Sequence, residues 1–190
     1  MSSASDPRRI LPDVLARDLD IVFCGTAAGS ASARKGAYYA GPGNAFWRTL
    51  YEVRLISRPV RPEDFTQLSE WNMGFTDLAK TVSGSDSTLS KTHFDAARLR
   101  QCVLEHRPGI LAFTGKRAAQ EFLGRNVEYG LLPDAIGTTR LFVLPSPSGA
   151  ARRYWDVKHW HELSRLRTAS GRQVSGETGK MPACARSSAG

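Results

Sequence analysis

Short apolar runs that end in Gly or Pro alternate along this chain with patterns typical of helices. The apolar runs cover residues 20–24, 110–114 and 141–144, and a weaker one covers 73–78. Runs this short that stop at a turn signal are typical of buried parallel strands. Helical patterns cover 44–53, 117–123 and 156–166, and another follows Thr92 and Asp95, which resemble a capping box. The alternation predicts an α/β fold: a single-domain, three-layer α/β/α sandwich around a central, mainly parallel four-stranded sheet.

In such a fold the loops at the carboxyl ends of the strands form the ligand crevice. The length of 190 residues gives room for one domain, which we place at 18–167. Residues 1–17 are polar and punctuated by Pro, and residues 168–190 are rich in Ser, Gly and Ala. Segments this poor in large apolar side chains do not offset their ordering entropy. We therefore expect a flexible N-terminal arm and a disordered C-terminal tail.

The chain is basic, with a formal net charge of +8. The tail carries +2 of this, so +6 belongs to residues 1–167. A basic domain suits a polyanionic partner, because Lys and Arg that neutralise phosphates release counterions, although a solvated basic surface is the plainer interpretation. Cys24, Cys102 and Cys184 have wide, irregular spacing and no His placed beside them, which argues against a disulfide framework or a metal. Without an apolar leader or membrane-length run, we expect a soluble cytoplasmic protein.

Three loops carry the candidate chemistry. The first, residues 25–30, follows the first strand, and its small residues let a planar ligand approach backbone N–H groups. The second, residues 36–47, brings Tyr38, Tyr39 and Asn44 ahead of a helix with Phe46 and Trp47. Aromatic rings beside a Gly-rich loop are what a nucleobase pocket needs. A plain turn explains the first loop equally well, and an N-cap at Asn44 with core aromatics explains the second.

The third loop, residues 144–153, is stiff and basic. Two prolines rigidify it, Ser146 and Ser148 offer hydroxyl groups to phosphate oxygens, and Arg152 and Arg153 supply positive charge. This composition suits insertion into a DNA groove, and it also suits an ordinary surface turn.

Taken together and in this order, the loops resemble those of the uracil-DNA glycosylase superfamily over about residues 18–167. The mismatch-specific uracil/thymine branch and the hypoxanthine-type branch are the most similar. The matching motifs are 25–29, Pro42-Gly-Asn44-Ala-Phe46-Trp47, Gly74-Phe75-Thr76, Thr114-Gly115-Lys116 and Leu144-Pro145-Ser146-Pro147-Ser148-Gly149.

The departures from the family pattern concern the catalytic residue. Ala27 stands where the mismatch-specific relatives carry the Asn that holds the attacking water. The hypoxanthine-type branch implies Asn44 as the substitute, and Asp77, just after the strand at Thr76, is the alternative. For Asp77 a structural role in capping or pairing with a Lys or Arg is the competing interpretation, and Asp86 is a weaker candidate. Ser146 replaces a family Asn, and Ala150 stands where a bulky wedge often enters DNA.

The resemblance implies a monofunctional glycosylase that flips uracil, or another deaminated base, out of DNA and hydrolyses its N-glycosidic bond without a metal or cofactor. The partner is DNA containing such a base, and we expect a monomer. The base-binding residues would be Gly25, Thr26, Ala27, Tyr39 and Phe46. The DNA-binding residues would be Lys116, Ser146, Ser148, Gly149, Ala150, Arg152 and Arg153. A non-catalytic or weakly catalytic binder of lesions or abasic sites is the alternative, motivated by Ala27. An enzyme acting on a free nucleotide is disfavoured because the chain has no phosphate-cradling motif.

Overall fold

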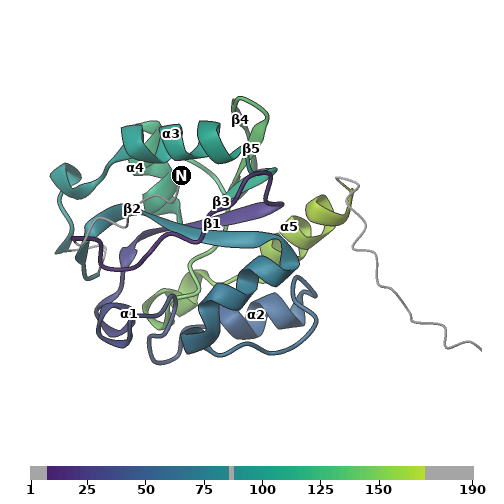
Figure 1. The fold of residues 1–190 in the computed structure, drawn as a ribbon, viewed down its shortest axis with the longest axis horizontal. Helices are drawn as coiled ribbons and strands as arrows, with labels where there is room; N and C mark the ends of the chain where they lie inside the picture. The colour runs from purple at the N-terminus through teal and green to yellow at the C-terminus, as the bar shows by residue number, and fades with distance from the viewer. Residues whose placement is uncertain (1–7, 86–87, 170–190) are drawn as a thin grey trace, which may run out of the picture.

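A computed structural model describes residues 8–85 and 88–169 of the chain. Its centre is a five-stranded sheet in the order β2-β1-β3-β5-β4 (Figure 1). The strands are β1 (Ile21–Ala28), β2 (Met73–Ser83), β3 (Ile110–Phe113), β4 (Gly130–Ile136) and β5 (Thr139–Val143). All neighbours pair in parallel except β4, which is antiparallel to β5 at one edge. The predicted mainly parallel sheet is confirmed, with β4 as a fifth strand beside the four expected.

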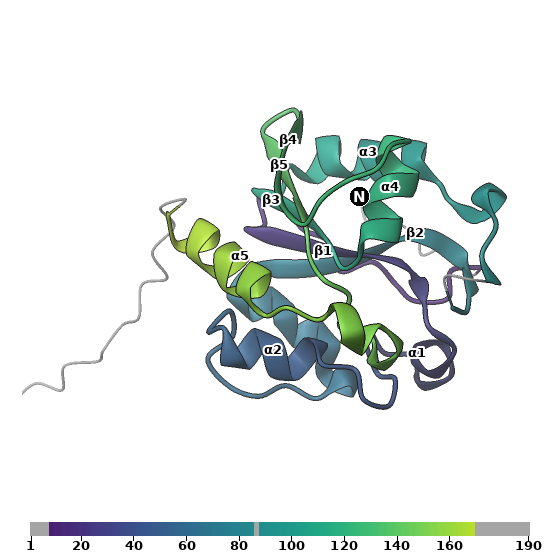
Figure 2. The ribbon, with the colours of Figure 1, turned by 180° about the vertical axis from the view of Figure 1, so that it is seen from behind.

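Helices cover both faces of the sheet. The α-helices are α1 (Ser30–Lys35), α2 (Phe46–Glu52), α3 (Ala96–His106), α4 (Lys116–Leu123) and α5 (Lys158–Ala169). The described residues also form the 3-10 segments η1 (Pro62–Trp71), η3 (Lys91–His93) and η4 (Gly149–Tyr154). Helices α3 and α4 lie on one face, and α2 and α5 lie on the other (Figures 1 and 2). The single-domain, three-layer architecture is therefore the predicted one.

The alternation of side chains along the strands explains why the core has two halves. Ile21 and Phe23 pack with α2 and α5, whereas Val22 and Cys24 pack with α3 and α4. Successive residues of a strand point to opposite faces, so a strand covered on both faces is apolar throughout. This is the physical reason for the continuous apolar run at 20–24.

A short polar side chain sets the beginning of α3. The Asp95 carboxylate accepts from the backbone N–H of Arg98 at 2.8 Å, so α3 begins at Ala96, and the predicted box of Thr92 with Asp95 does not form. Its place is taken by a box of Ser90 and His93 around η3. A side-chain oxygen that satisfies a free N–H in the first turn is the common way to start a helix.

Residues 8–17 pack along β2, where the sequence led us to expect a flexible arm. The N–H of Ile10 donates to the carbonyl of Lys80 at 2.8 Å, and Val14 forms an antiparallel bridge with Phe75. The Leu11 side chain is 2 % exposed and belongs to the core. This segment therefore covers the outer edge of β2. Residues 1–7 and 170–190, which include Cys184 and nearly all of the expected tail, lie outside the described residues.

The first strand is longer than its apolar run. Its pairing with β3 ends at Cys24, but its pairing with β2 continues to Ala28. One backbone edge of residues 25–28 thus continues the sheet while the other has no strand partner among the described residues. Within residues 8–85 and 88–169, no helix is long and apolar enough to span a membrane.

Candidate active site

A cavity of about 720 Å³ opens at the carboxyl ends of the parallel strands. The three loops singled out in the sequence meet there, together with β2. The lining comprises residues 25–32, 38–39, 41–42, 114–115 and 146–151, with Leu11, Asn44, Asp77, Gly84, Ser85 and Tyr154. The sheet topology thus brings together segments that are more than a hundred residues apart, at the place where a parallel α/β fold binds ligands.

Asp77 is a buried carboxyl group in the wall of this cavity. It lies in β2 directly beside Gly25 of β1, and its side chain covers that glycine. A Cβ added to Gly25 would lie 2.5 Å from Asp77 Oδ1, so the close approach requires glycine. Asp77 is only 3 % exposed. Asp77 lies within the strand predicted at 73–78, which continues to Ser83, and the pairing of this strand with β1 fixes the position of Asp77.

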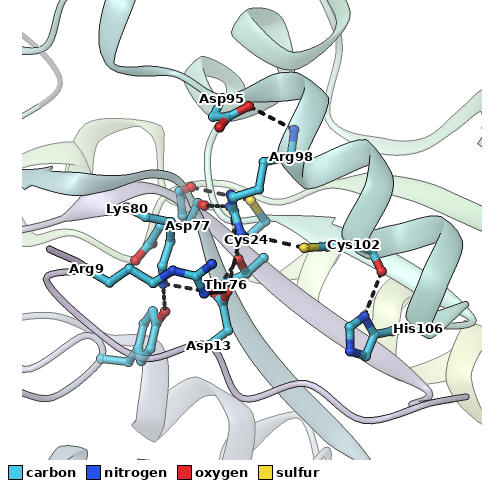
Figure 3. Close-up of polar contacts among 12 residues, drawn as sticks. Arg9, Asp13, Cys24, Thr76, Asp77, Lys80, Asp95, Arg98, Cys102 and His106 are labelled. Atoms are coloured by element: carbon cyan, nitrogen blue, oxygen red, sulfur yellow. Dashed lines mark hydrogen bonds and ion pairs between the residues drawn. The ribbon is translucent and has the colours of Figure 1, made fainter. Parts of the chain in front are cut away.

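Burial raises the pKa of Asp77 to about 6, because desolvation penalises the charged carboxylate. Lys80, a hydrogen bond from Tyr38 and the charge of Arg98 oppose this rise, and the nearby Asp13 adds to it. Figure 3 shows Asp77 beside Lys80 and Arg98. A carboxyl group with this pKa changes its charge between mildly acidic and neutral pH.

Tyr39 supplies the aromatic ring of the cavity. Its hydroxyl group lies 3.0 Å from Thr114 Oγ1, and its ring stacks on Phe46 with centroids 3.9 Å apart and an interplanar angle of 8°. Burial holds the pKa of Tyr39 well above its usual value, so its hydroxyl stays protonated. Phe46 is 0 % exposed and is not among the cavity-lining residues. The ring in the cavity wall is therefore that of Tyr39, and the Phe46 ring stacks on it from the protein interior.

Asn44 lines the cavity and also serves the helix that follows it. Its Oδ1 accepts from the backbone N–H of Phe46 at 2.9 Å. Ala45, not Asn44, is the N-cap of α2, so Asn44 forms a turn just before the helix instead of the N-cap expected from the sequence. The bond uses one of the two acceptor positions of the side-chain oxygen. Thr26 and Ala27 line the cavity from the open edge of β1. Asp86 lies outside the described residues.

The closing loop forms the rim of the cavity. Ser146, Ser148, Gly149 and Ala150 line it, and the Ser148 side chain accepts from the N–H of Ala150 to begin η4. Gly149 packs against the turn at 42–43, where an added Cβ would lie 3.3 Å from a carbonyl oxygen. The tight packing fixes the loop against the second motif.

The basic residues differ in their surroundings. Arg152 and Arg153 are exposed on η4. Lys116 instead pairs with Glu128 at 2.8 Å and lies 4.6 Å from the ring centroid of Tyr129, outside the cavity lining. The sequence reasoning did not single out Tyr154, a rim residue that is 55 % exposed. The sequence feature that could have identified Tyr154 is its position directly after Arg153. The guanidinium carbon of Arg153 lies 4.5 Å from the centroid of the Tyr154 ring.

Sequence reasoning also left Tyr38 and Lys80 without a role. Both are buried beside Asp77, and the Lys80 ammonium donates to the Tyr38 hydroxyl at 3.0 Å. An isolated Lys in an apolar strand pattern was the available signal. Within 8–85 and 88–169, no group of three or more His, Cys, Asp or Glu side chains is placed to hold a metal ion.

Comparison with known proteins agrees with the geometry. A solution NMR structure of a candidate uracil DNA glycosylase from Methanosarcina acetivorans has the same fold, with a TM-score of 0.55 and 23 % sequence identity. The match covers 85 % of this chain and 97 % of the archaeal one. The family model of the uracil DNA glycosylase superfamily matches residues 12–168, which include every lining segment of the cavity except Leu11. This chain therefore belongs to the uracil DNA glycosylase superfamily.

Proposed function

We propose that this protein is a monofunctional DNA glycosylase that excises uracil, with Asp77 holding the attacking water. The observation that carries the proposal is the buried Asp77 carboxyl group in the wall of a cavity built from the family's motifs. Superfamily membership supports glycosylase chemistry in general. The choice of uracil and of Asp77 is our inference.

The reaction needs a departing base, an oxocarbenium-like sugar and a water molecule. In the proposed step the bond between the anomeric carbon and the base nitrogen breaks, and its electron pair leaves with the base. The water oxygen bonds to the anomeric carbon and gives its proton to the Asp77 carboxylate. The negative carboxylate also stabilises the positive sugar, which is an electrostatic effect that is strong at a buried site. A positioned general base contributes about 10²–10⁴-fold.

The first strand and Tyr39 would hold the base. Thr26 and Ala27 lie on the stretch of β1 that has no strand partner on its β3 side among the described residues. Successive residues of a strand direct their backbone groups to opposite edges, and the Cys24 carbonyl accepts from Thr114 on the β3 side, so the Thr26 N–H faces the unpaired edge and would bind a uracil carbonyl. Donors held in place there would also stabilise the charge on the leaving base. The Tyr39 ring, supported by Phe46, offers a stacking face, and Ala27 leaves room where relatives carry a larger catalytic side chain.

The closing loop and η4 would bind the DNA around the flipped nucleotide. Ser146, Ser148 and Gly149 form a rigid rim, and Arg152 and Arg153 bring positive charge to it. Tyr154 is an exposed ring for stacking on a neighbouring base, since Ala150 is too small to fill the gap left in the helix. Lys116 contributes only if DNA displaces Glu128.

The test is a panel of single- and double-stranded oligonucleotides carrying one deaminated base each, assayed in EDTA under single-turnover conditions. We expect abasic sites from uracil substrates. Asp77→Asn should reduce the rate by about 10²–10⁴-fold while leaving DNA affinity within a few-fold. Asn44→Ala should act mainly through the lost hydrogen bond to the Phe46 N–H, worth about 1 kcal/mol of stability.

Two outcomes would overturn this assignment. A wild-type protein that binds lesion-containing DNA but releases no base from any substrate would establish the alternative, a binding protein, which Ala27 favours. An active Asp77→Asn variant together with an inactive, folded Asn44→Ala variant would move the water-holding role to Asn44.

A further inference from the structure

Behind Asp77 lies a buried charge cluster that the proposed reaction does not use. It joins Asp13 of the N-terminal segment, Lys80 of β2 and Arg98 of α3 (Figure 3). The Asp13 carboxylate lies 2.9 Å from Lys80 Nζ and 3.3 Å from Arg98, and the Lys80 side chain is 4 % exposed. Buried charges are costly unless paired, so a cluster kept next to a catalytic wall calls for an explanation.

Tyr38 connects this cluster to Asp77. Lys80 Nζ donates to Tyr38 Oη at 3.0 Å. Tyr38 lines the cavity together with Asp77, and hydrogen bonding by the Tyr38 hydroxyl lowers the pKa of the Asp77 carboxyl group. An ammonium group only donates, so Tyr38 accepts from Lys80 and directs its own proton to Asp77. The Tyr38 ring cannot turn away, because it stacks on Phe75 with centroids 4.7 Å apart and an interplanar angle of 11°.

We propose that Tyr38 and Lys80 are positioning residues that orient the Asp77 carboxylate toward the cavity and keep it charged, with Asp13 as the counterion of Lys80. The proposal rests on the function proposed above for Asp77. Tyr38 acts on the carboxylate through its hydroxyl group, and Gly25, which has no side chain, leaves room for Asp77 Oδ1.

The charged surroundings of Asp77 give this arrangement a measurable signature. The groups that act on it are Lys80 on its own strand, Tyr38 after α1, Asp13 on the N-terminal segment and Arg98 on α3. Burial raises the pKa values of the neighbouring Tyr39 and Cys24, and the charge of Asp77 adds to the rise. Burial raises the pKa of Asp77, while the Lys80 charge and the Tyr38 hydrogen bond lower it. Removing either of these two groups should therefore raise that pKa further.

The experiment is a pH profile of the single-turnover excision rate, using a uracil oligonucleotide saturated with protein. The wild-type rate should fall on the acid side with a midpoint near 6, where Asp77 becomes protonated. Tyr38→Phe keeps the stacked ring and removes only the hydroxyl group. Its midpoint should move up by about one pH unit, the value of one hydrogen bond to a charged group.

Two further variants separate positioning from packing. Lys80→Met should also shift the midpoint to higher pH. Lys80→Arg keeps the charge and a donor, so its midpoint should lie close to that of the wild type. Tyr51→Phe, the same change on the exposed face of α2, should leave the profile unchanged. If Lys80→Met does not fold, Tyr38→Phe decides alone.

The failures can be told apart. An unmoved midpoint in Tyr38→Phe, with Asp77→Asn inactive, removes the positioning roles and leaves the function of Asp77 intact. An Asp77→Asn variant as active as the wild type removes the proposed role of Asp77, and the positioning roles fall with it.

Discussion

Asp77 occupies a place that folding alone does not favour for a carboxyl group. Its neighbours on β2 are Thr76 and Leu78, both buried, and its strand partner Gly25 forgoes a side chain to accommodate it. Desolvating a charged carboxylate costs free energy, and the cost is visible in its raised pKa. Ionisable groups with such perturbed pKa values gather at functional sites.

This cost leads to a prediction about stability. The pKa of Asp77 is about 6 in the folded protein against an ordinary 3.8, so the folded state holds this proton more tightly than the unfolded chain. Its stabilising contribution is full below the unfolded value and is lost as the pH rises through 6. Asp77→Asn should therefore raise the free energy of unfolding at pH 8 by up to about 3 kcal/mol, with little change at pH 4.

Urea unfolding at both pH values measures the effect, with the surface variant Asp64→Asn as control. A loss of stability at pH 8 would show that Asp77 is a structural ion-pair residue. A gain in stability with a loss of excision is the pattern of a residue kept for function.

Gly25 lies beside Asp77 and has no side chain, so substituting it tests the position of the carboxylate. Gly25→Ala would place a methyl group 2.5 Å from Asp77 Oδ1 and displace the carboxylate, whereas Gly29→Ala meets nothing within 4 Å. We expect Gly25→Ala to lose at least about tenfold in the single-turnover rate and Gly29→Ala to stay near the wild type. Equal rates for the two variants, both folded by circular dichroism, would mean that the carboxylate position does not matter.

At the scale of elements, the sequence predicts the buried strands and the helix faces but not the strand ends. It misses β4, because Gly130 and Pro133 interrupt the pattern and the strand lies half-exposed at a sheet edge. It ends β1 at Cys24, because the small residues 25–28 resemble a loop until their pairing with β2 is known. That same pairing places Asp77, which the sequence names as the alternative to Asn44, in the cavity wall, and this position could not be known before the strand end was.

The element η4 carries the basic character of the cavity rim. The affinity of a protein for DNA falls as salt rises, and each phosphate contact makes the slope of log affinity against log salt more negative by about one. Arg152→Ala combined with Arg153→Ala should weaken DNA binding equally for all sequences and make this slope shallower by about two. The excision rate at saturating protein should stay nearly unchanged. Binding titrations at several salt concentrations test this, with Arg125→Ala as the control, since that side chain pairs with Asp134 outside the cavity lining. An unchanged slope would place the DNA elsewhere.

At the scale of the whole molecule, the N-terminal segment ties β2 to α3 through one side chain. Asp13 pairs with Arg9, Lys80 and Arg98 and accepts from Thr76 at 2.7 Å. The sequence predicts a flexible arm here because residues 1–17 are polar and punctuated by Pro. Its order comes from long-range ion pairs and edge pairing, which no local pattern reports.

The stability contributed by the ion pairs of Asp13 depends on pH. Burial alone would raise the pKa of Asp13, but the charge and hydrogen bond of Lys80, with Thr76 and Arg98, outweigh it and leave the pKa below its ordinary value. Asp13 therefore contributes stability above its unfolded pKa and loses it as the pH falls through the folded one, the opposite sign to Asp77. Asp13→Ala leaves the buried Lys80 ammonium unpaired and should cost about 3–5 kcal/mol at pH 7. Asp64→Ala, which breaks an exposed pair with Arg61, should cost less than about 1 kcal/mol. Urea unfolding of both variants at pH 7 decides the matter, because similar small losses would mean that the segment adds little to the stability of the domain.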